Sequence, residues 1–463
     1  MAEKPNDDWQ AHLPAPLLDF IAGRRIDEVE CVVPDFAGIA RGKAIPAKKF
    51  SLKDRSFLPI SMFYITIAGT YAEHGSGDED WLTERDMVLR PDMTTATAVP
   101  WADEPTMQVI NDLEDVDGTP ISLAPRNVLK RVIAEYRALG LEPVVAPEME
   151  FYLTSPNVDP NDPIEPPVGR TGRRGIGRQA YSIAAVDEYG PVIDDIYEFA
   201  DAQGLGIDAI TQEDGAGQIE INLQHGDPLR LADQVFYFKR SIREAALLNG
   251  CFATFMAKPM KNEPGSAMHI HQSVLNSVTR TNAFTDENGE ATEMFHAFIA
   301  GLQTYLPHVL LLMAPYVNSY RRFGTDTAAP GNFEWDTDNR TAGIRIPISE
   351  GWARRVENRI SGMDANPYLA IAGNLAAGLL GIKNKLKPKE RVGGPTSQVP
   401  QSDKIIIPRA MTTALSLFEE NDEMRSLLGE DFCRIYQRLK EHELNEFLSE
   451  ISAWEREHLL LNV

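Results

Sequence analysis

The residues with the clearest capacity for chemistry are glutamates that alternate with apolar residues. In the segment VVAPEMEFYL, Met149 and Phe151 fall on one face of an extended strand, and Glu148 and Glu150 fall on the other. A strand with one solvated face shows the same alternation, so this segment alone has two readings. Neighbouring carboxylates on one face are also a common way to hold a metal ion.

Three further segments, QIEINL, MHIHQSV and RRVENR, repeat this alternation of apolar and polar residues. Glu213 precedes the first of them by a few residues. The polar residues that these segments bring to one face, together with Glu213, are Glu213, Glu220, His269, His271, Ser273, Arg355, Glu357 and Arg359. Each strand alone could again be a solvent-facing one, but four such strands together favour a shared polar site.

Carboxylates dominate the resulting set of candidate metal ligands. The set is Glu148, Glu150, Glu213, Glu220, Glu357 and His269. Such a cluster in one cleft would repel itself unless divalent cations neutralised it. Oxygen-rich ligation with one nitrogen suits Mg²⁺ or Mn²⁺ better than Zn²⁺.

Arginines accompany this acidic set along the chain. They are Arg322, Arg340, Arg345, Arg355 and Arg359. Metal-binding carboxylates beside anion-binding guanidinium groups are what phosphoryl transfer requires, because metals bridge phosphate oxygens and arginines stabilise the developing charge. The alternation does not by itself establish that the strands meet in space.

Composition narrows the class of protein further. The formal net charge is −23, from 68 acidic and 45 basic residues, which disfavours binding to nucleic acid or to an anionic membrane. Cys31, Cys251 and Cys433 are too few and too scattered for a disulfide framework. No signal peptide is visible, and the apolar stretch from Pro367 to Ile382 is shorter than the ~18–20 residues of a membrane span. We therefore expect a cytoplasmic protein whose longest apolar stretch is a buried helix.

Elements can be placed coarsely from turn and helix signals. Residues 15–110 predict short strands and turns, and a cluster of turn residues near 112–126 marks a boundary. Pro125 then opens a helix that ends at Gly140. The larger second region alternates helices with strands and finishes in helices between Ala410 and Leu459. The basic loop 169–177, GRTGRRGIG, lacks the ending of a P-loop and predicts a mobile surface loop.

At the polar strands the chain resembles the glutamine synthetase family. PEMEFYL, QEDGAGQIEINL and PGSAMHIHQS are similar to its metal-binding strands, and NSYRRF to its glutamate-binding arginine segment. DNRTAGIRIP and ARRVENRISGMDANPYL complete the series in the same order. The resemblance covers most of residues 20–400.

The resemblance implies an α+β fold with a small N-terminal β-grasp domain and a larger catalytic domain. We place these domains at residues 15–115 and 116–463, with an antiparallel sheet lining the active site of the second. It also implies a homo-oligomer of two stacked rings, a dodecamer, with active sites at the subunit borders. The substrates would be ATP, glutamate and an amine, with two Mg²⁺ or Mn²⁺ ions in each site.

The family's residue roles carry over motif by motif as expectations. One metal would be held by Glu150, Glu213 and Glu220, and the second by Glu148, His269 and Glu357. The carboxylates of glutamate would be bound by Arg322 and Arg359, with the backbone of Gly265 close by. The catalytic residues would be Arg340, which would stabilise the transferred phosphoryl group, and Arg322. The ATP contacts would be Asp208, His271, Ser273, Arg345 and Arg355.

Two departures from the family pattern concern the nucleophile. The family's ammonia-binding aspartate has no counterpart in FLPISMFY, which contains no acid between Phe57 and Tyr64. The family's flap glutamate is replaced by Ala328 in FGTDTAAP. Both missing carboxylates would bind ammonium and accept its proton. Their loss predicts an organic amine instead, with its carbon chain against Leu58, Ile60, Met62 and Phe63.

LPISMF and NSYRRFG also resemble the γ-glutamylpolyamine synthetase branch of the family. The function predicted is therefore an ATP-dependent ligase that joins glutamate to an organic amine through γ-glutamyl phosphate. A true glutamine synthetase with a rearranged ammonia site, and a non-catalytic structural ring, remain alternatives. The amine itself stays open among putrescine, longer polyamines, ethanolamine and monoamines. Glu73, Asp78, Glu79 and Asp80 form an acidic loop that could bind a distal amino group or merely face solvent.

Overall fold

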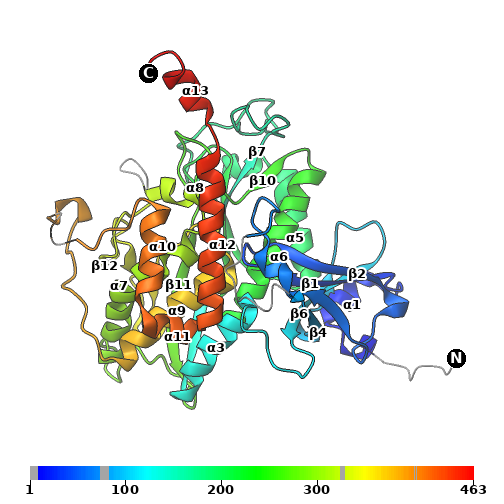
Figure 1. Cartoon of the computed structure of the whole chain (residues 1–463), viewed down its shortest axis with the longest axis horizontal. Coiled ribbons are helices and arrows are strands. Elements are labelled where there is room, and N and C mark those ends of the chain that lie inside the picture. Colours follow the sequence, from blue (N-terminus) through cyan, green and yellow to red (C-terminus); the bar gives the residue numbers. More distant parts are fainter. Residues whose placement is uncertain (1–8, 73–82, 324–328, 401, 403) are drawn as a thin grey trace.

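Two β-sheets, one from the early and one from the later part of the chain, organise this molecule (Figure 1). The computed structural model describes residues 9–72, 83–323, 329–400, 402 and 404–463. The N-terminal strands lie to the right in Figure 1, and the larger region with most of the helices lies to the left. Sheets and packed helices together confirm the predicted α+β class.

The N-terminal sheet has six strands in the order β2-β1-β6-β4-β3, with β5 paired to β6. β1 and β6 run parallel, and the other pairs are antiparallel. At Gly42 the two paired strands approach so closely that a Cβ atom would lie 1.9 Å from the carbonyl oxygen of Cys31. The elements of this region are α1 (Ala15–Ile21), β1 (Glu28–Pro34), β2 (Ala40–Pro46), β3 (Ser56–Pro59), β4 (Asp86–Pro91), β5 (Thr97–Ala98) and β6 (Thr106–Glu114), with short 3-10 helices η1 (Trp9–His12), η2 (Ala47–Lys49), η3 (Ile60–Tyr64) and η4 (Met93–Thr95).

The second sheet has eight strands in the order β12-β13-β14-β11-β7-β9-β8, with β10 paired to β7. All its pairs are antiparallel except β12 with β13, which is parallel. The sheet was expected to be antiparallel, and only this edge departs from that. Its strands are β7 (Leu141–Thr154), β8 (Ile207–Gln212), β9 (Gln218–Leu223), β10 (Phe252–Thr254), β11 (Met268–Asn276), β12 (Trp335–Thr337), β13 (Ile344–Ile346) and β14 (Val356–Asn358).

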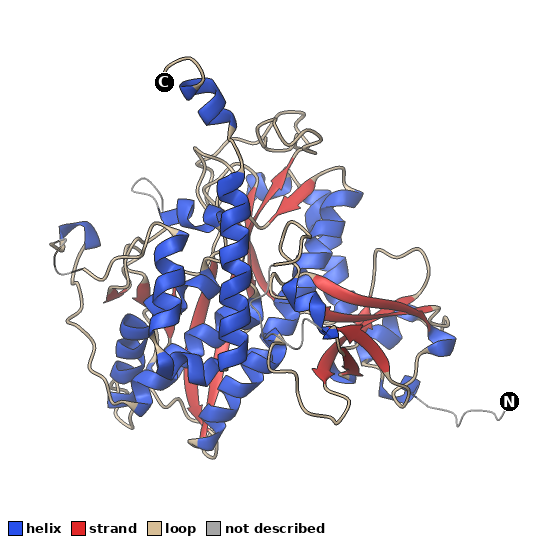
Figure 2. Ribbon diagram, in the orientation of Figure 1, coloured by secondary structure: helices blue, strands red, loops and turns tan. Residues whose placement is uncertain are grey.

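Helices pack beside this second sheet and hold its apolar face (Figure 2). The predicted helix after Pro125 is α3, and Gly140 follows its end with a left-handed φ of 71°. The segment from Pro367 forms α9, which is almost wholly buried as expected. The helices are α3 (Pro125–Ala138), α4 (Ile183–Asp187), α5 (Gly190–Gln203), α6 (Pro228–Leu248), α7 (Glu293–Met313), α8 (Val317–Tyr320), α9 (Pro367–Lys383), α10 (Met411–Glu420), α11 (Asp422–Leu428), α12 (Glu430–Ser449) and α13 (Ala453–Leu459), with η5 (Arg321–Phe323), η6 (Gly351–Ala353) and η7 (Thr396–Gln398).

α7 is the one helix of the described residues that is long and apolar enough to cross a membrane by length and composition. However, 78% of its most apolar window is buried inside the protein, against α9 and α10. It is therefore a core helix of the folded chain.

A buried arginine joins the two regions. Arg126 at the start of α3 donates to Asp92 and Asp112 of the N-terminal region and to Asp233 of α6, at distances of 2.6 to 3.0 Å. The aromatic ring of Phe36, beyond β1, also packs against Phe432 of α12 at 5.7 Å. These contacts fix the N-terminal sheet to the helices, while the exact division at residues 115 and 116 stays a prediction.

Candidate active site

Two adjacent cavities lie along the second sheet and share the side chain of Glu148. The smaller one, of about 320 Å³, is lined by the polar residues of β7, β9, β11 and β14, and we name it the metal cavity after the ligands predicted from the sequence. The larger one, of about 1030 Å³, extends along β7 and β11 to η6, and we name it the nucleotide cavity after the ATP contacts predicted from the sequence.

Strand pairing explains how residues far apart in sequence reach the metal cavity. β7 pairs with β9 so that Glu150 faces Glu220, and with β11 so that His269 faces Glu148. β14 pairs on the other side of β11 and brings in Glu357. The structure thus gathers all of the predicted metal ligands in one cavity: Glu148, Glu150, Glu213, Glu220, His269 and Glu357.

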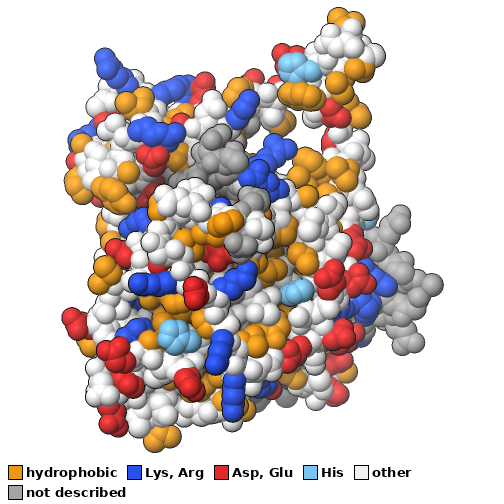
Figure 3. Space-filling view, turned by 90° about the vertical axis from the view of Figure 1, so that its left-hand side faces the viewer, with side chains coloured by type: hydrophobic (Ala, Val, Ile, Leu, Met, Phe, Trp, Pro, Cys, Tyr) orange, Lys and Arg blue, Asp and Glu red, His pale blue; other side chains and the backbone are white. Residues whose placement is uncertain are grey.

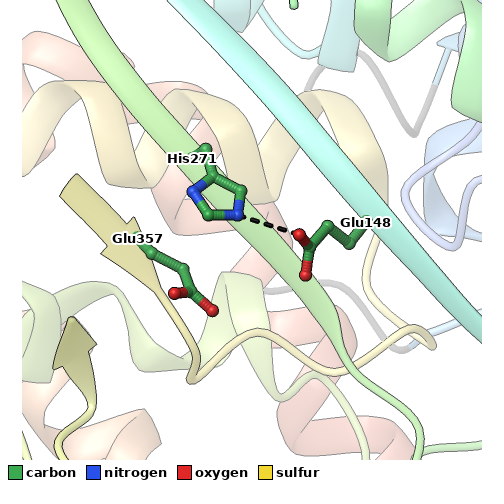
Figure 4. Close-up of side chains that lie close together, drawn as sticks. All are labelled: Glu148, His271 and Glu357. Atoms are coloured by element: carbon green, nitrogen blue, oxygen red, sulfur yellow. Dashed lines mark hydrogen bonds and ion pairs between the residues drawn. The ribbon is translucent and has the colours of Figure 1, made fainter. Parts of the chain in front are cut away.

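Glu148 contacts two histidines of strand β11, and Figure 4 shows one of these contacts. One of its oxygens lies 3.2 Å from Nδ1 of His269, and the other lies 2.9 Å from Nε2 of His271. Arg355 donates through Nε to Nδ1 of His271 at 3.3 Å. Because that nitrogen accepts a hydrogen bond, His271 carries its proton on Nε2 and donates to Glu148.

The carboxyl groups of Glu150 and Glu220 resist ionisation in the protein alone. Burial and the proximity of Glu213 and Glu220 raise the pKa of Glu150 well above its usual range. Burial, Glu148 and Glu213 raise the pKa of Glu220 to about 8. Burial, with Arg359 nearby, lowers the pKa of His269 to about 4, which favours the neutral imidazole that can bind a metal. Divalent cations would stabilise the ionised form of these buried carboxyl groups, beside a neutral imidazole that can also bind a metal.

The geometry groups the ligand atoms differently from the two predicted triads. Ligand atoms of Glu148, Glu220 and His269 lie within 4.8 Å of one another, as do those of Glu148, His271 and Glu357. Figure 4 shows the second group converging from three strands. Glu148 belongs to both groups, and His271, assigned to ATP from the sequence, lies at ligand distance from two glutamates. The assignment of each residue to one metal stays a prediction.

Arginines close the other side of the metal cavity. Arg345 and Arg359 each donate to Glu357, at 2.7 and 2.5 Å, and both keep a buried Nε with no hydrogen-bond partner within the described residues. Arg345 lines this cavity and not the nucleotide cavity, although the sequence assigned it to ATP. Arg340 also lines it, is exposed, and helps to lower the pKa of Glu213 against the stronger effect of burial.

Arg322 is almost fully buried and is held by the backbone. Its two terminal nitrogens donate to the carbonyl oxygens of Ile360 and Arg359 at 2.7 and 2.8 Å. A Cβ at Gly265 would lie 2.7 Å from Cγ of Arg322 and 2.5 Å from the carbonyl oxygen of Ala257. Only glycine fits there, so Gly265 is required by the close packing of Arg322 as well as by any approach to substrate.

Some lining residues gave no signal in the sequence. Tyr181 and Asp214 border the metal cavity from the loops before α4 and between β8 and β9. Gln218 donates to the carbonyl oxygen of Gly265 at 3.0 Å and approaches Glu150 at 3.4 Å. Gln218 does lie on the polar face that the alternation of QIEINL predicts, together with Glu220, whereas Tyr181 and Asp214 lie in loops that have no such alternation.

The nucleotide cavity contains four of the five residues predicted to contact ATP. They are Asp208, His271, Ser273 and Arg355. His271 and Ser273 follow His269 along one face of β11, so the cavity continues directly from the metal cavity.

The predicted amine wall is mostly wrong. Ile60 and Phe63 are 0% and 1% exposed, and Phe63 packs against Phe36 with ring centroids 5.1 Å apart. Met62 is also buried, and none of these residues lines either cavity. These three side chains are buried in the hydrophobic core of their own chain, so they are not free to contact an amine. Of the four predicted residues, Leu58 alone is partly exposed.

Two other predicted features lie outside the described residues. They are Ala328 and the acidic loop with Glu73, Asp78, Glu79 and Asp80. The basic loop 169–177 is described, and it forms turns without a helix or strand. All three cysteines are free thiols, as predicted.

Comparison with known proteins defines the class. The family model "Glutamine synthetase, catalytic domain" matches residues 122–459. The chain therefore belongs to the glutamine synthetase family.

Among individual relatives, gamma-glutamylputrescine synthetase PuuA of Escherichia coli (strain K12) is 37% identical over 440 residues, covering 94% of this chain and 92% of that protein. A glutamate–isopropylamine ligase of Pseudomonas sp is 33% identical over 448 residues, covering 94% and 95%. The solved structure "Apo GmaS without ligand" superposes with a TM-score of 0.78 at 26% identity, covering 96% of this chain and 99% of that one.

Proposed function

We propose that this protein is a ligase that uses ATP to join the side-chain carboxyl of glutamate to an organic amine, through γ-glutamyl phosphate. The observation that carries the proposal is the cavity of buried carboxylates and arginines that shares Glu148 with a larger cavity. Such an arrangement can bring a nucleotide's terminal phosphate against a carboxylate substrate.

The metal cavity suits two Mg²⁺ or Mn²⁺ ions, because its carboxylates are buried and mutually repulsive. Bound there, the ions would neutralise phosphate oxygens and make the terminal phosphorus a better electrophile. The chain's own residues do the rest. Glu148, held by His269 and His271, lies where the two cavities meet. The exposed guanidinium of Arg340 would stabilise the negative charge on the phosphoryl group during its transfer.

For glutamate, the free donors of the arginine cluster are the best candidates. Arg359 is fixed by Glu357 and keeps its Nε unpaired, so it is preorganised to donate to a carboxylate. Arg322 holds the backbone of residues 359 and 360 and thereby positions Arg359. Attack of a glutamate carboxylate oxygen on the terminal phosphate would release ADP, and attack of the amine on the acyl phosphate would then release phosphate.

An organic amine is favoured over ammonia by the sequence between Phe57 and Tyr64 and by Ala328, where the ammonia-binding acids of the family are absent. Both relatives described above are named for organic amines, putrescine and isopropylamine. A true glutamine synthetase remains the second candidate, and a non-catalytic ring is disfavoured because all the metal ligands are present in one cavity.

The test is an ATP-hydrolysis assay with glutamate against a panel of putrescine, longer polyamines, ethanolamine, short monoamines and ammonium. We expect ADP release that depends on glutamate and on one class of organic amine. Faster turnover with ammonium than with every organic amine would instead identify a glutamine synthetase. Absence of turnover with all of them would contradict both enzymatic readings.

We further propose a cytoplasmic homo-oligomer of two stacked rings. The C-terminal segment supports assembly, because it stands away from the body and exposes apolar side chains (Figure 3). Trp454 is 62% exposed and Leu461 is 92% exposed. Apolar residues grouped on a projecting segment are typical of a contact with another chain. Analytical ultracentrifugation of the full chain would measure the number of subunits.

A further inference from the structure

The basic loop 169–177 lines a separate cavity of about 320 Å³, which we name the loop cavity. Residues of α4, together with Tyr189 and with Gln212 of β8, complete its walls. Among the described residues it shares no lining side chain with the metal cavity or the nucleotide cavity. Its volume falls within the range of small-molecule sites, roughly 300 to 1,000 Å³.

The loop packs closely on two neighbouring side chains through its glycines. A Cβ atom at Gly169 would lie 2.1 Å from a carboxylate oxygen of Glu188, and one at Gly175 would lie 2.4 Å from the hydroxyl oxygen of Tyr189. Thr171 donates to the same oxygen of Glu188 through its backbone nitrogen and its hydroxyl, at 3.2 and 3.0 Å. Glycine therefore lets the loop close on these side chains and leaves a preformed cavity.

Two buried polar atoms on the wall of this cavity have no hydrogen-bond partner within the described residues. They are the hydroxyl oxygen of Tyr189 and Oε1 of Gln212, whose residues are 5% and 2% exposed. The hydroxyl lies between Gly175 and Gly217, both of which line the cavity, and a Cβ atom at Gly217 would lie 3.6 Å from it. Buried polar groups are nearly always paired, so two unpaired ones at a single cavity indicate a ligand.

The unpaired groups specify what the ligand must offer. The side-chain nitrogen of Gln212 already donates to the carbonyl oxygens of Glu213 and Gly215, each at 2.9 Å, so its Oε1 requires a donor from the ligand. Burial raises the pKa of the Tyr189 hydroxyl to about 12, so this group keeps its proton and requires an acceptor. Arg173 also lines the cavity and forms no ion pair within the described residues, so it favours an anion as that acceptor.

The other charged residues of the wall already have partners. Arg174 forms an ion pair with Glu165 at 2.8 Å and donates to the hydroxyl of Ser155 at 2.7 Å. Glu188 accepts the two bonds from Thr171. One available guanidinium group matches one carboxylate, whereas a doubly charged phosphate would meet the negative charge of Glu188 with less compensation.

Gln212 connects the loop cavity to the metal cavity. It directly precedes Glu213, and its side chain holds the turn of residues 213–215. Its carbonyl oxygen also accepts from the backbone nitrogen of Tyr181, which lines the metal cavity, at 2.9 Å. A ligand that donates to Oε1 polarises the amide and so strengthens the two bonds that Gln212 donates to this turn.

We propose that the loop cavity is an effector site for a free amino acid, whose carboxylate binds Arg173 and the Tyr189 hydroxyl and whose ammonium group donates to Gln212. The bound amino acid fixes the turn that carries Glu213 and so tightens cation binding in the metal cavity. Amino acid binding does not depend on the proposed function, whereas this coupling rests on the metal sites that the proposed function assumes. Glutamate and its γ-glutamyl amides belong to this class of ligand.

Calorimetry on the full-length protein without ATP tests binding, with L-alanine, L-serine and L-glutamine titrated in turn. Ethylamine and propionate each lack one charged group of L-alanine and should bind at least about tenfold more weakly than L-alanine. Tyr189→Phe removes a single hydroxyl group and should raise the Kd for the amino acids about tenfold, as should Arg173→Gln. Because that hydroxyl has no partner, Tyr189→Phe should not lower the Tm.

Arg170→Gln is the matched control, since Arg170 lies in the same loop, pairs with Asp187 at 3.5 Å and does not line the cavity. It should leave the Kd for the amino acids unchanged. A second titration measures the Kd for Mg²⁺ with and without saturating L-alanine. This Kd should fall about fivefold in the native protein and in Arg170→Gln, and should stay constant in Tyr189→Phe.

Amino acid binding that survives both Tyr189→Phe and Arg173→Gln would overturn the inference, because the amino acids would then occupy another site. No binding by any of the three amino acids would also overturn it and leave water as the occupant of the cavity. A Kd for Mg²⁺ that L-alanine does not change would overturn the coupling. All three results would leave the proposed function standing, whereas a native protein that binds no Mg²⁺ would contradict the metal sites of the proposed function itself.

Discussion

Replacing Glu220 by glutamine should stabilise the metal-free protein while removing its response to metal. The side chain of Glu220 lies in the metal cavity, where Asn222 donates to its Oε1 at 3.1 Å. Glutamine can keep that hydrogen bond and has nearly the same shape. The substitution therefore removes a charge and little else.

The magnitude follows from the pKa of Glu220. Burial and two neighbouring glutamates raise this pKa from 4.5 to about 8. A shift of that size corresponds to about 5 kcal/mol, and we take roughly 2 kcal/mol after allowing for partial exposure. Because the folded state retains a proton that the unfolded state has lost, native stability falls as the pH rises from 4.5 to 8. The gain of Glu220→Gln should be absent near pH 4.5 and largest at pH 8, about 2 °C in Tm for a chain of this length.

Differential scanning calorimetry at several pH values, with EDTA and then with Mg²⁺, measures both effects. Mg²⁺ should raise the Tm of the native protein more at pH 8 than at pH 6, because the ion competes with the proton. It should raise the Tm of Glu220→Gln much less. Glu142→Gln on the neighbouring strand β7 lines neither cavity and should behave like the native protein. A Glu220→Gln protein that is less stable than native at pH 8 without metal, or equally stabilised by Mg²⁺, would refute the reasoning.

Four further substitutions test the remaining roles. Glu150→Ala should abolish ADP release even at saturating Mg²⁺, and near-normal turnover would contradict its role as a ligand. Arg359→Lys keeps the charge but loses the planar fork, so the KM for glutamate should rise at least tenfold, roughly the value of one charged hydrogen bond, with the KM for ATP little changed; the reverse pattern would exchange the arginine roles. Gly265→Ala should displace Arg322, lowering stability by about 1–3 kcal/mol and raising the KM for glutamate; unchanged values in thermal melts and kinetics would show that the site can relax. Ala328→Glu should raise turnover with ammonium relative to the organic amine, and an unchanged ratio in the amine panel would count against the ammonia argument.

The metal cavity could be predicted because strands impose a strict period. Glu148, Glu150 and Glu220 had to share faces once their segments were extended, and pairing of β7 with β9 then brought them together. Which strand pairs with the outer side of β14 could not be predicted in the same way, because the alternation within a strand does not name its partner. The pairing of β13 with β14 sets Arg345 opposite Glu357, and so moves this arginine to the metal cavity. Register between strands depends on the whole sheet, and a local pattern does not contain it.

The apolar residues of η3 show a different limit of the sequence. Ile60 and Phe63 occupy a segment whose family counterpart contacts the nucleophile, so an apolar pocket was a reasonable expectation. A single segment cannot reveal whether an apolar side chain faces a ligand or the core. Phe63 faces the core because it packs against Phe36, which in turn packs against Phe432 and Tyr436 of α12. These partners are distant from Phe63 in the sequence.

The shared wall between the two cavities has a thermodynamic consequence. Arg355, His271, Glu148 and His269 form one continuous series of hydrogen bonds from the nucleotide cavity to the metal cavity. A phosphate that attracted Arg355 would weaken its bond to His271 and so alter the electron density that Glu148 offers to a cation. Linkage would make the effect reciprocal: the factor by which nucleotide changes the affinity for metal equals the factor by which metal changes the affinity for nucleotide. For the nucleotide and metal proposed above, the two affinities would then be coupled through this one series of hydrogen bonds.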